Sequence, residues 1–238
     1  MKKLLILSGV ATTFVSLPAF ADVTVLDFEN IAPYPNGNNV FVQNYYNGGT
    51  SSIGTSGTNL GVGFSDNALL ICLNTPGVTC SNTSKGGLGN LDSQQGALFF
   101  LSGSETFLNF EAGFDTGFSF FYTAPNRTGS IGVYDGLNGE GNLLSTLDLG
   151  STPSTCASDF NAFFCPFVPI GVAFDGIAKS ISFAGVANQI AFDDITFGSV
   201  IPDPGPENPS SVPEPATVLG LLAIGALGAG SKLKCKLK

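Results

Sequence analysis

Short runs of apolar and aromatic residues, separated by turn-forming residues, repeat along almost the whole middle of this chain. Dipeptides such as Asn36-Gly37, Asp135-Gly136 and Asp175-Gly176 provide the positive backbone φ angles that tight hairpin turns require. With 31 glycines and 14 prolines among 238 residues, no stretch between residues 22 and 199 sustains the 3.6-residue apolar period of a helix. The sequence therefore predicts an all-β domain.

Eleven of these runs are predicted to be strands. They cover residues 23–29, 40–46, 68–73, 97–101, 106–110, 117–122, 130–134, 143–149, 170–174, 180–183 and 189–197. Their number and spacing are typical of a two-sheet antiparallel β-sandwich with a jelly-roll-like arrangement. We expect this sandwich to occupy residues 22–199, which is enough chain for one domain with one core.

The first 21 residues have the features of a secretory signal peptide. Lys2 and Lys3 precede an apolar segment, residues 4–15, and Ala19 and Ala21 form a small-x-small cleavage site. Cleavage after Ala21 would leave the rest of the chain exported.

Three features follow one another at the C-terminus. Val212, Pro213, Glu214 and Pro215 form a box that its prolines keep extended, residues 216–230 are uncharged and mostly apolar, and a lysine-rich tail closes the chain. This order resembles the PEP-CTERM sorting signal of Gram-negative bacteria, whose carriers are processed by membrane proteases of the exosortase type. The resemblance implies a sorting signal with a single transmembrane helix at residues 213–238, after a Pro-rich stalk at residues 200–212. The helix and the lysines alone would also suit an ordinary single-span tail anchor.

The signal implies a route for the protein. Because positive residues stay in the cytoplasm, the sandwich would face the periplasm during a transient stay at the inner membrane, and would then reach the cell surface or the extracellular matrix. Five segments, residues 117–122, 132–136, 171–174, 178–183 and 188–197, are also similar to repeated phrases of PEP-CTERM β-sandwich proteins. That family is associated with exopolysaccharide and biofilm matrix, so exopolysaccharide is an expected partner.

The exported part of the chain is strongly acidic. It contains all eighteen acidic residues, whereas Lys85, Arg127 and Lys179 are its only basic ones. Nucleic acid is therefore excluded as a partner, because phosphate binding needs clustered Lys and Arg. Divalent cations suit such a surface, and the same charge would also keep an apolar-rich exported protein soluble.

The residue types needed for common catalytic sites are missing. The chain has no His and no Trp, which removes the commonest general base and the hydrolase triads, so we expect no enzyme and no catalytic residues. Two carboxylates could still serve a glycosidase, but the sequence context singles out no pair. Tyr34 and Tyr45 are candidates for stacking against sugar rings, which keeps a carbohydrate-binding module as the alternative function.

Cysteine spacing fits an exported protein. Cys72 and Cys80 flank one turn-rich segment, and Cys156 and Cys165 flank another. Each pair could close a short loop by a disulfide in the oxidising periplasm. These spacings do not match the ligand pattern of a zinc site.

The alternation of the last predicted strand slips at two aspartates. The apolar residues 190 and 192 share one face, but the apolar residues 195 and 197 fall on the other parity. A β-bulge at the aspartates between them would turn all four inward.

These aspartates are also candidate metal ligands. In sandwiches that resemble carbohydrate-binding modules, an acidic residue of the first strand and one of the last often meet at a structural Ca²⁺. That arrangement would here involve Glu29 with Asp193 or Asp194. The aspartates could instead be solvated or cap a turn.

Overall fold

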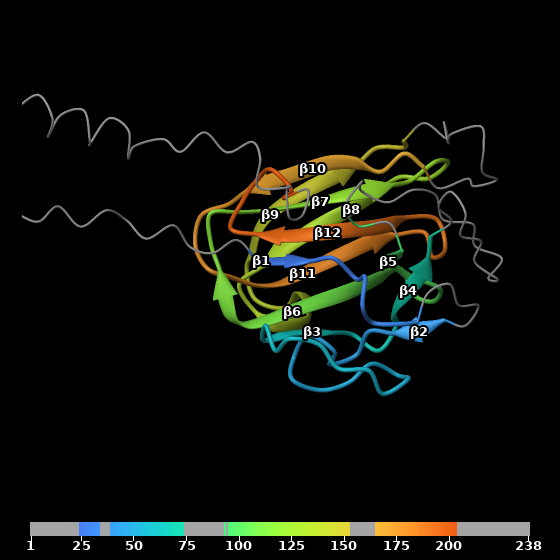
Figure 1. The fold of residues 1–238 in the computed structure, drawn as a ribbon. Helices are drawn as coiled ribbons and strands as arrows, with labels where there is room; N and C mark the ends of the chain where they lie inside the picture. The colour runs from blue at the N-terminus through green and yellow to red at the C-terminus, as the bar shows by residue number, and fades with distance from the viewer. Residues whose placement is uncertain (1–23, 34–38, 74–92, 94, 153–164, 204–238) are drawn as a thin grey trace, which may run out of the picture.

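The computed structural model describes residues 24–33, 39–73, 93, 95–152 and 165–203. They form two antiparallel sheets packed face to face, as Figure 1 shows, so the predicted all-β sandwich is confirmed. These ranges contain no helix with the length and hydrophobicity that a membrane span requires. The signal peptide with Ala19 and Ala21, and the predicted C-terminal helix, lie outside the described residues.

The larger sheet has seven strands in the order β10-β7-β12-β5-β4-β2, with β1 also beside β12. Their bounds are β1 Thr24–Leu26, β2 Val40–Phe41, β4 Ala68–Cys72, β5 Gly96–Phe100, β7 Gly117–Thr123, β10 Val168–Ala173 and β12 Ala191–Phe197. On the side of β12 away from β7, Phe192 pairs with Leu98 of β5, whereas Ile195 pairs with Leu26 of β1. The last strand therefore changes partner from β5 to β1 at its two aspartates.

The smaller sheet has five strands in the order β3-β6-β11-β8-β9. Their bounds are β3 Val62–Phe64, β6 Glu105–Phe114, β8 Gly129–Tyr134, β9 Leu143–Leu149 and β11 Ala178–Gly185. A short 3-10 helix, Leu137–Gly139, lies in the turn between β8 and β9.

Phenylalanine rings fill the space between the sheets. Phe120 and Phe192 from the larger sheet and Phe183 from the smaller one are all fully buried. The rings of Phe183 and Phe192 meet edge to face with centroids 4.7 Å apart, a favourable geometry for aromatic pairs. Alternate side chains of the strands supply this core, as a period of two requires.

The strand predicted at residues 40–46 was wrong beyond Phe41. Gln43 has a φ of 50°, which a continuing strand does not allow, and the chain turns there. The turn points Tyr46 into the core, where its hydroxyl accepts a hydrogen bond of 3.0 Å from the amide of Phe28. The short strand β3 was not predicted, because its three residues include a glycine.

The chain after β12 folds back onto the larger sheet. We call residues 199–203 the C-terminal strap. The amide of Asp203 donates to Thr196 Oγ1 at 3.1 Å, and a Cβ atom added at Gly171 of β10 would collide with the carbonyl oxygen of Val200. The predicted domain boundary at residue 199 therefore falls at the start of a packed segment.

Two of the cysteines are described. Cys72, at the end of β4, and Cys165 are each disulfide-bonded. Cys80 and Cys156 lie outside the described residues. The local pairing of Cys72 with Cys80 and of Cys156 with Cys165 stays a prediction.

Candidate functional site

The bulge predicted in the last strand is confirmed. Asp193 pairs with Phe121 of β7 and Thr196 pairs with Ser119, so two residues of β12 stand opposite one residue of β7. Asp194 takes a φ of 47°, and the alternation resets there. As a result, the apolar side chains at positions 190, 192, 195 and 197 all reach the core.

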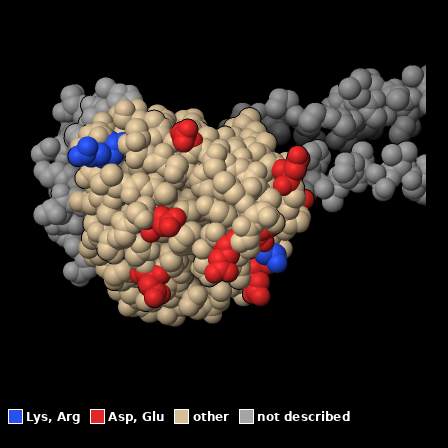
Figure 2. All heavy atoms as spheres, turned by 180° about the vertical axis from the view of Figure 1, so that it is seen from behind, with Lys and Arg blue, Asp and Glu red and all other residues tan. Residues whose placement is uncertain are grey.

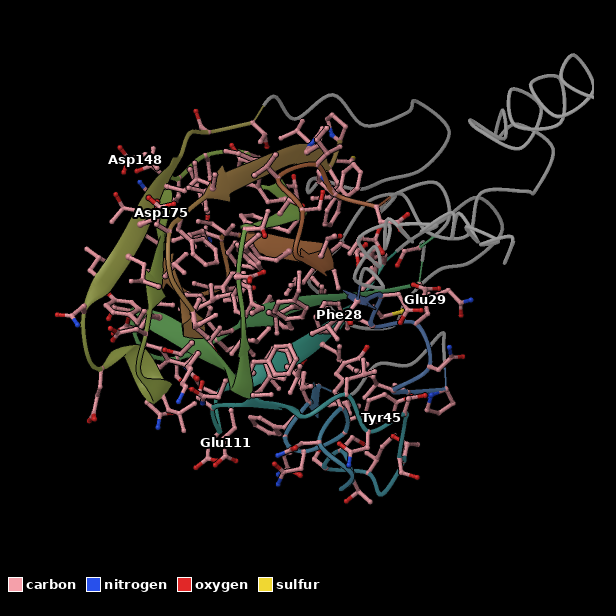
Figure 3. The ribbon with its side chains drawn as sticks, turned by 90° about the vertical axis from the view of Figure 1, so that its left-hand side faces the viewer. Phe28, Glu29, Tyr45, Glu111, Asp148 and Asp175 are labelled. Carbon is pink, nitrogen blue, oxygen red and sulfur yellow. The ribbon has the colours of Figure 1, made fainter. Side chains whose placement is uncertain are left out.

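Glu29 follows the first strand and reaches the beginning of β5. One carboxylate oxygen, Oε1, accepts hydrogen bonds from the amides of Gln95 at 2.7 Å and Gly96 at 3.0 Å. The preceding residue, Phe28, has a φ of 56° and a fully buried ring, so its position is fixed by the core (Figure 3). Glu29 therefore lies where β1 and β5 meet end to end along β12.

Ser93 links the first strand region to the last strand. Its hydroxyl oxygen lies 2.8 Å from the carbonyl oxygen of Asp27, 3.3 Å from Glu29 Oε1 and 3.3 Å from Asp193 Oδ1. A serine hydroxyl has only one hydrogen to donate, so it can satisfy only one of these three acceptors at a time. Three acceptor oxygens, from Asp27, Glu29 and Asp193, therefore lie around one hydroxyl that can donate to only one of them.

Sequence reasoning brought together Glu29 and Asp193 but missed Ser93 and the Asp27 carbonyl. Ser93 belongs to no recognisable motif, and a main-chain carbonyl leaves no mark in a sequence. Ser93 reaches Glu29, Asp27 and Asp193 across 64, 66 and 100 positions of the chain.

The electrostatics of this junction disfavour ionised carboxylates. Burial raises the pKa of Asp193 well above its ordinary value, and the neighbouring carboxylate of Asp194 raises it further. Burial also raises the pKa of Glu29, against the opposing effect of its hydrogen bonds from Gly96, Gln95 and Ser93. Asp193 Oδ2 is buried and has no hydrogen-bond partner in the described part of the chain. Ionisation of this cluster needs a compensating positive charge.

The donors at this junction are all oxygens. Carboxylate, hydroxyl and carbonyl oxygens suit Ca²⁺, which accepts all three kinds, and do not suit zinc. Within the described ranges, no group of three or more His, Cys, Asp or Glu side chains is placed to hold a metal. An ion here would therefore draw on the Ser93 hydroxyl and the Asp27 carbonyl besides Glu29 and Asp193.

Tyr45, one of the two predicted sugar-stacking residues, is buried. Tyr45 is only 6% exposed, its ring meets that of Tyr46 edge to face at 4.9 Å, and Gly57 packs directly against it. No ring face of Tyr45 is open to a sugar. Tyr34 lies outside the described residues, as do Val212, Pro213, Glu214 and Pro215 of the sorting box.

Two solved structures are similar to parts of this chain. One is a carbohydrate-binding module, CsCBM6-3 from Clostridium stercorarium in complex with cellobiose, at 19% identity over 56% of this chain and 82% of that chain, with a TM-score of 0.34. The other is the K2 cleaved adhesin domain of Lys-gingipain, at 12% identity over 58% of this chain and 90% of that chain, with a TM-score of 0.36. A search among curated proteins gave no match.

The predicted PEP-CTERM sorting signal is confirmed by a family match. Residues 211–234 match the PEP-CTERM protein-sorting motif, a range that includes the Pro-Glu-Pro box and the apolar segment. This motif is a sorting signal recognised by exosortase, a membrane processing enzyme. By this match the chain carries the C-terminal sorting signal of PEP-CTERM proteins and is an exported protein.

Proposed function

We propose that this protein is a non-catalytic component of the cell surface or extracellular matrix. It is exported by its signal peptide, held transiently at the inner membrane and processed by an exosortase-type protease. The observation that carries this proposal is the sorting motif at residues 211–234. The strongly acidic exported chain and the absence of His support a binding or structural role over catalysis.

Association with exopolysaccharide or biofilm matrix is part of the same proposal. A compact sandwich without a net positive surface would contact such a matrix through hydrogen bonds and aromatic rings and not through ion pairs with anionic groups. The alternative function is that of a carbohydrate-binding module. A glycosidase that uses two carboxylates is a less favoured alternative.

Processing can be tested by changing the box and leaving the stalk. A Pro213→Ala, Pro215→Ala chain should stay in the membrane fraction with its tail attached, because the extended box is lost. A matched chain with Pro206→Ala and Pro209→Ala keeps the box and should be released like the wild type. The measurement is the mass of the chain in membrane and released fractions. Equal release of both variants would contradict exosortase processing through this motif.

We also propose that the sandwich holds one structural Ca²⁺ at Glu29 and Asp193, beside Asp194. The convergence of acceptor oxygens on Ser93 supports it, as does the buried Asp193 Oδ2, which has no hydrogen-bond partner among the residues that the structure describes. An ion at a hundred times its dissociation constant would add about 2.7 kcal/mol to the free energy of unfolding.

Thermal melting of the full chain tests this ion. Chelator should lower the melting temperature of the wild type, and should leave that of Asp193→Asn unchanged. Asp148→Asn removes an exposed carboxylate of β9, on the opposite side of the sandwich from Glu29 (Figure 3), and should respond to chelator like the wild type. Identical melting curves of the wild type in calcium and in chelator would contradict the proposed Ca²⁺ site.

A further inference from the structure

The outer face of the five-stranded sheet carries aromatic and hydroxyl side chains in one row. Phe107 of β6 is paired with Ser182 of β11, Ser182 with Gly132 of β8, and Gly132 with Thr146 of β9. Their strand neighbours Leu108, Ile131 and Val133 point into the core, so this row points outward. Figure 2 looks at this side of the molecule.

Tyr134 lies across the row. A Cβ atom added at Gly132 would lie 2.7 Å from Cε2, 2.8 Å from the hydroxyl oxygen and 3.0 Å from Cζ of Tyr134. The ring therefore rests over the glycine, where a side chain would displace it. Tyr134 is nevertheless partly exposed, so part of the ring faces solvent.

A second ring lies beyond Ser182. Phe107 is also partly exposed, and Gly139 of the turn after β8 packs against it, where an added Cβ would lie 2.5 Å from Cε1. Since β6 and β8 are separated by β11, the two aromatic residues start on strands about 10 Å apart. Between them, the buried Ser182 donates a 2.5 Å hydrogen bond to Glu105 Oε2.

We propose that this face binds a neutral polysaccharide strand. Phe107 and Tyr134 provide apolar surface for the faces of sugar rings, and Glu105, Thr146 and Asp148 provide hydrogen-bonding groups for sugar hydroxyls. We name Phe107, Tyr134, Glu105, Thr146 and Asp148 the sheet-face platform. This inference deepens the proposed association with exopolysaccharide and rests on it.

Charge decides between kinds of polysaccharide. Acidic side chains are spread over this face and basic ones occur only near its margins (Figure 2). In the platform itself, Glu105 and Asp148 are acidic and no residue is basic. A chain of uronic acids would be repelled, since like charges brought together without compensation disfavour binding. The partner is therefore a glycan of neutral sugars.

The test uses the full chain and glycans of two charge types. Neutral gluco- and manno-oligosaccharides are compared with oligogalacturonate by calorimetry. We expect binding of a neutral oligosaccharide, an affinity loss of about tenfold in Tyr134→Ala, and near wild-type affinity in Tyr134→Phe. Gly132→Ala should also weaken binding because it displaces the ring without removing it. Phe41→Ala, which removes a 38% exposed ring from the other sheet, should bind like the wild type.

Thermal melting of each variant separates loss of the site from loss of the fold. A Tyr134→Ala chain that melts like the wild type and binds as tightly would overturn the platform. So would preference for oligogalacturonate, or failure of the wild type to bind any neutral oligosaccharide. If such a chain is still processed and released normally, the proposed export function stands and only the glycan face is lost.

Discussion

At the level of single residues, Asp193 decides how the junction of the first and last strands behaves. It is fully buried, its Oδ1 accepts from the amide of Asp194 at 2.9 Å, and its Oδ2 has no hydrogen-bond partner within the described ranges. Arg127 and Lys179, the basic residues of the described part, belong to the loop before β8 and to β11 of the other sheet. No basic side chain of these described ranges is therefore placed beside the carboxylate, and a proton or a bound cation would balance its charge.

The pH dependence of stability distinguishes these two states. A carboxyl whose pKa is raised in the folded protein binds its proton more tightly there than in the unfolded chain. Its contribution to the free energy of unfolding is fully present below the unfolded pKa and is lost as the pH rises through the folded pKa. In chelator, the melting temperature should therefore fall from acidic to neutral pH, and Glu29 acts in the same direction.

In the Asp193→Asn variant, the melting temperature in chelator should fall less between acidic and neutral pH. In chelator at neutral pH this variant should melt several degrees above the wild type, because no buried charge remains. In saturating calcium the order should reverse, because only the wild type binds the ion. Parallel pH profiles of the wild type and Asp193→Asn in chelator would show that Asp193 is not the group that titrates. Asp148→Asn is the exposed-carboxylate control.

At the level of elements, the last strand and the C-terminal strap close the larger sheet together. Because of the bulge, the first half of β12 pairs with β5 and the second half pairs with β1. The apolar side chains of both halves still point into the core. The strap then returns over β7 and β10, where Gly117 and Gly171 leave room for Val200. A glycine is needed at position 171 because any Cβ would collide with the strap.

Shortening the chain measures how much the C-terminal strap contributes to stability. A protein ending at Asp203 should melt like the full chain, whereas one ending at Ser199 should melt several degrees lower, since it loses Val200 and the hydrogen bond from Asp203 to Thr196. Gly171→Ala should cost about 1–3 kcal/mol through overpacking. Gly150→Ala is the matched control, because nothing lies within 4 Å of the added Cβ there. Equal melting of the chains ending at 199 and 203 would show that the strap adds no stability.

At the level of the whole molecule, the sandwich is exported as an acidic body with two described disulfide-bonded cysteines. Cys72 ends β4 of the larger sheet, and Cys165 comes just before β10 of the same sheet. Oxidising conditions outside the cytoplasm favour such bonds, in agreement with the exported state that the sorting motif implies.

We expect the disulfides to be local. Pairing of Cys72 with Cys80 and of Cys156 with Cys165 closes short loops, each worth about 2.5 kcal/mol on the chain-entropy account. Non-reducing peptide mapping should recover each pair in its own peptide or in neighbouring ones, and reduction should lower the melting temperature. A peptide that joins the region of residues 72–80 to that of residues 156–165 would show that the pairing crosses the sheet.

Features with a local period or a local motif could be predicted from the amino-acid sequence. Alternation of apolar side chains and turn dipeptides predicted the sheets, because each strand records burial residue by residue. The parity slip at Asp193 and Asp194 predicted the bulge for the same reason. The sorting motif was readable because a processing enzyme recognises a continuous segment.

Contacts between residues far apart in the chain could not be predicted in this way, because they depend on the folded arrangement of the strands. Glu29 and Asp193 were paired from a resemblance, but Ser93 joined them only because β12 changes partner from β5 to β1. Tyr45 was expected to be open to sugars, yet the turn at Gln43 buries it. The ring of Tyr134 packs over Gly132 of the same strand, a contact that the sequence did not indicate. These contacts are fixed by strand order and side-chain packing. Neither leaves a periodic pattern in the sequence from which the contacts could be predicted.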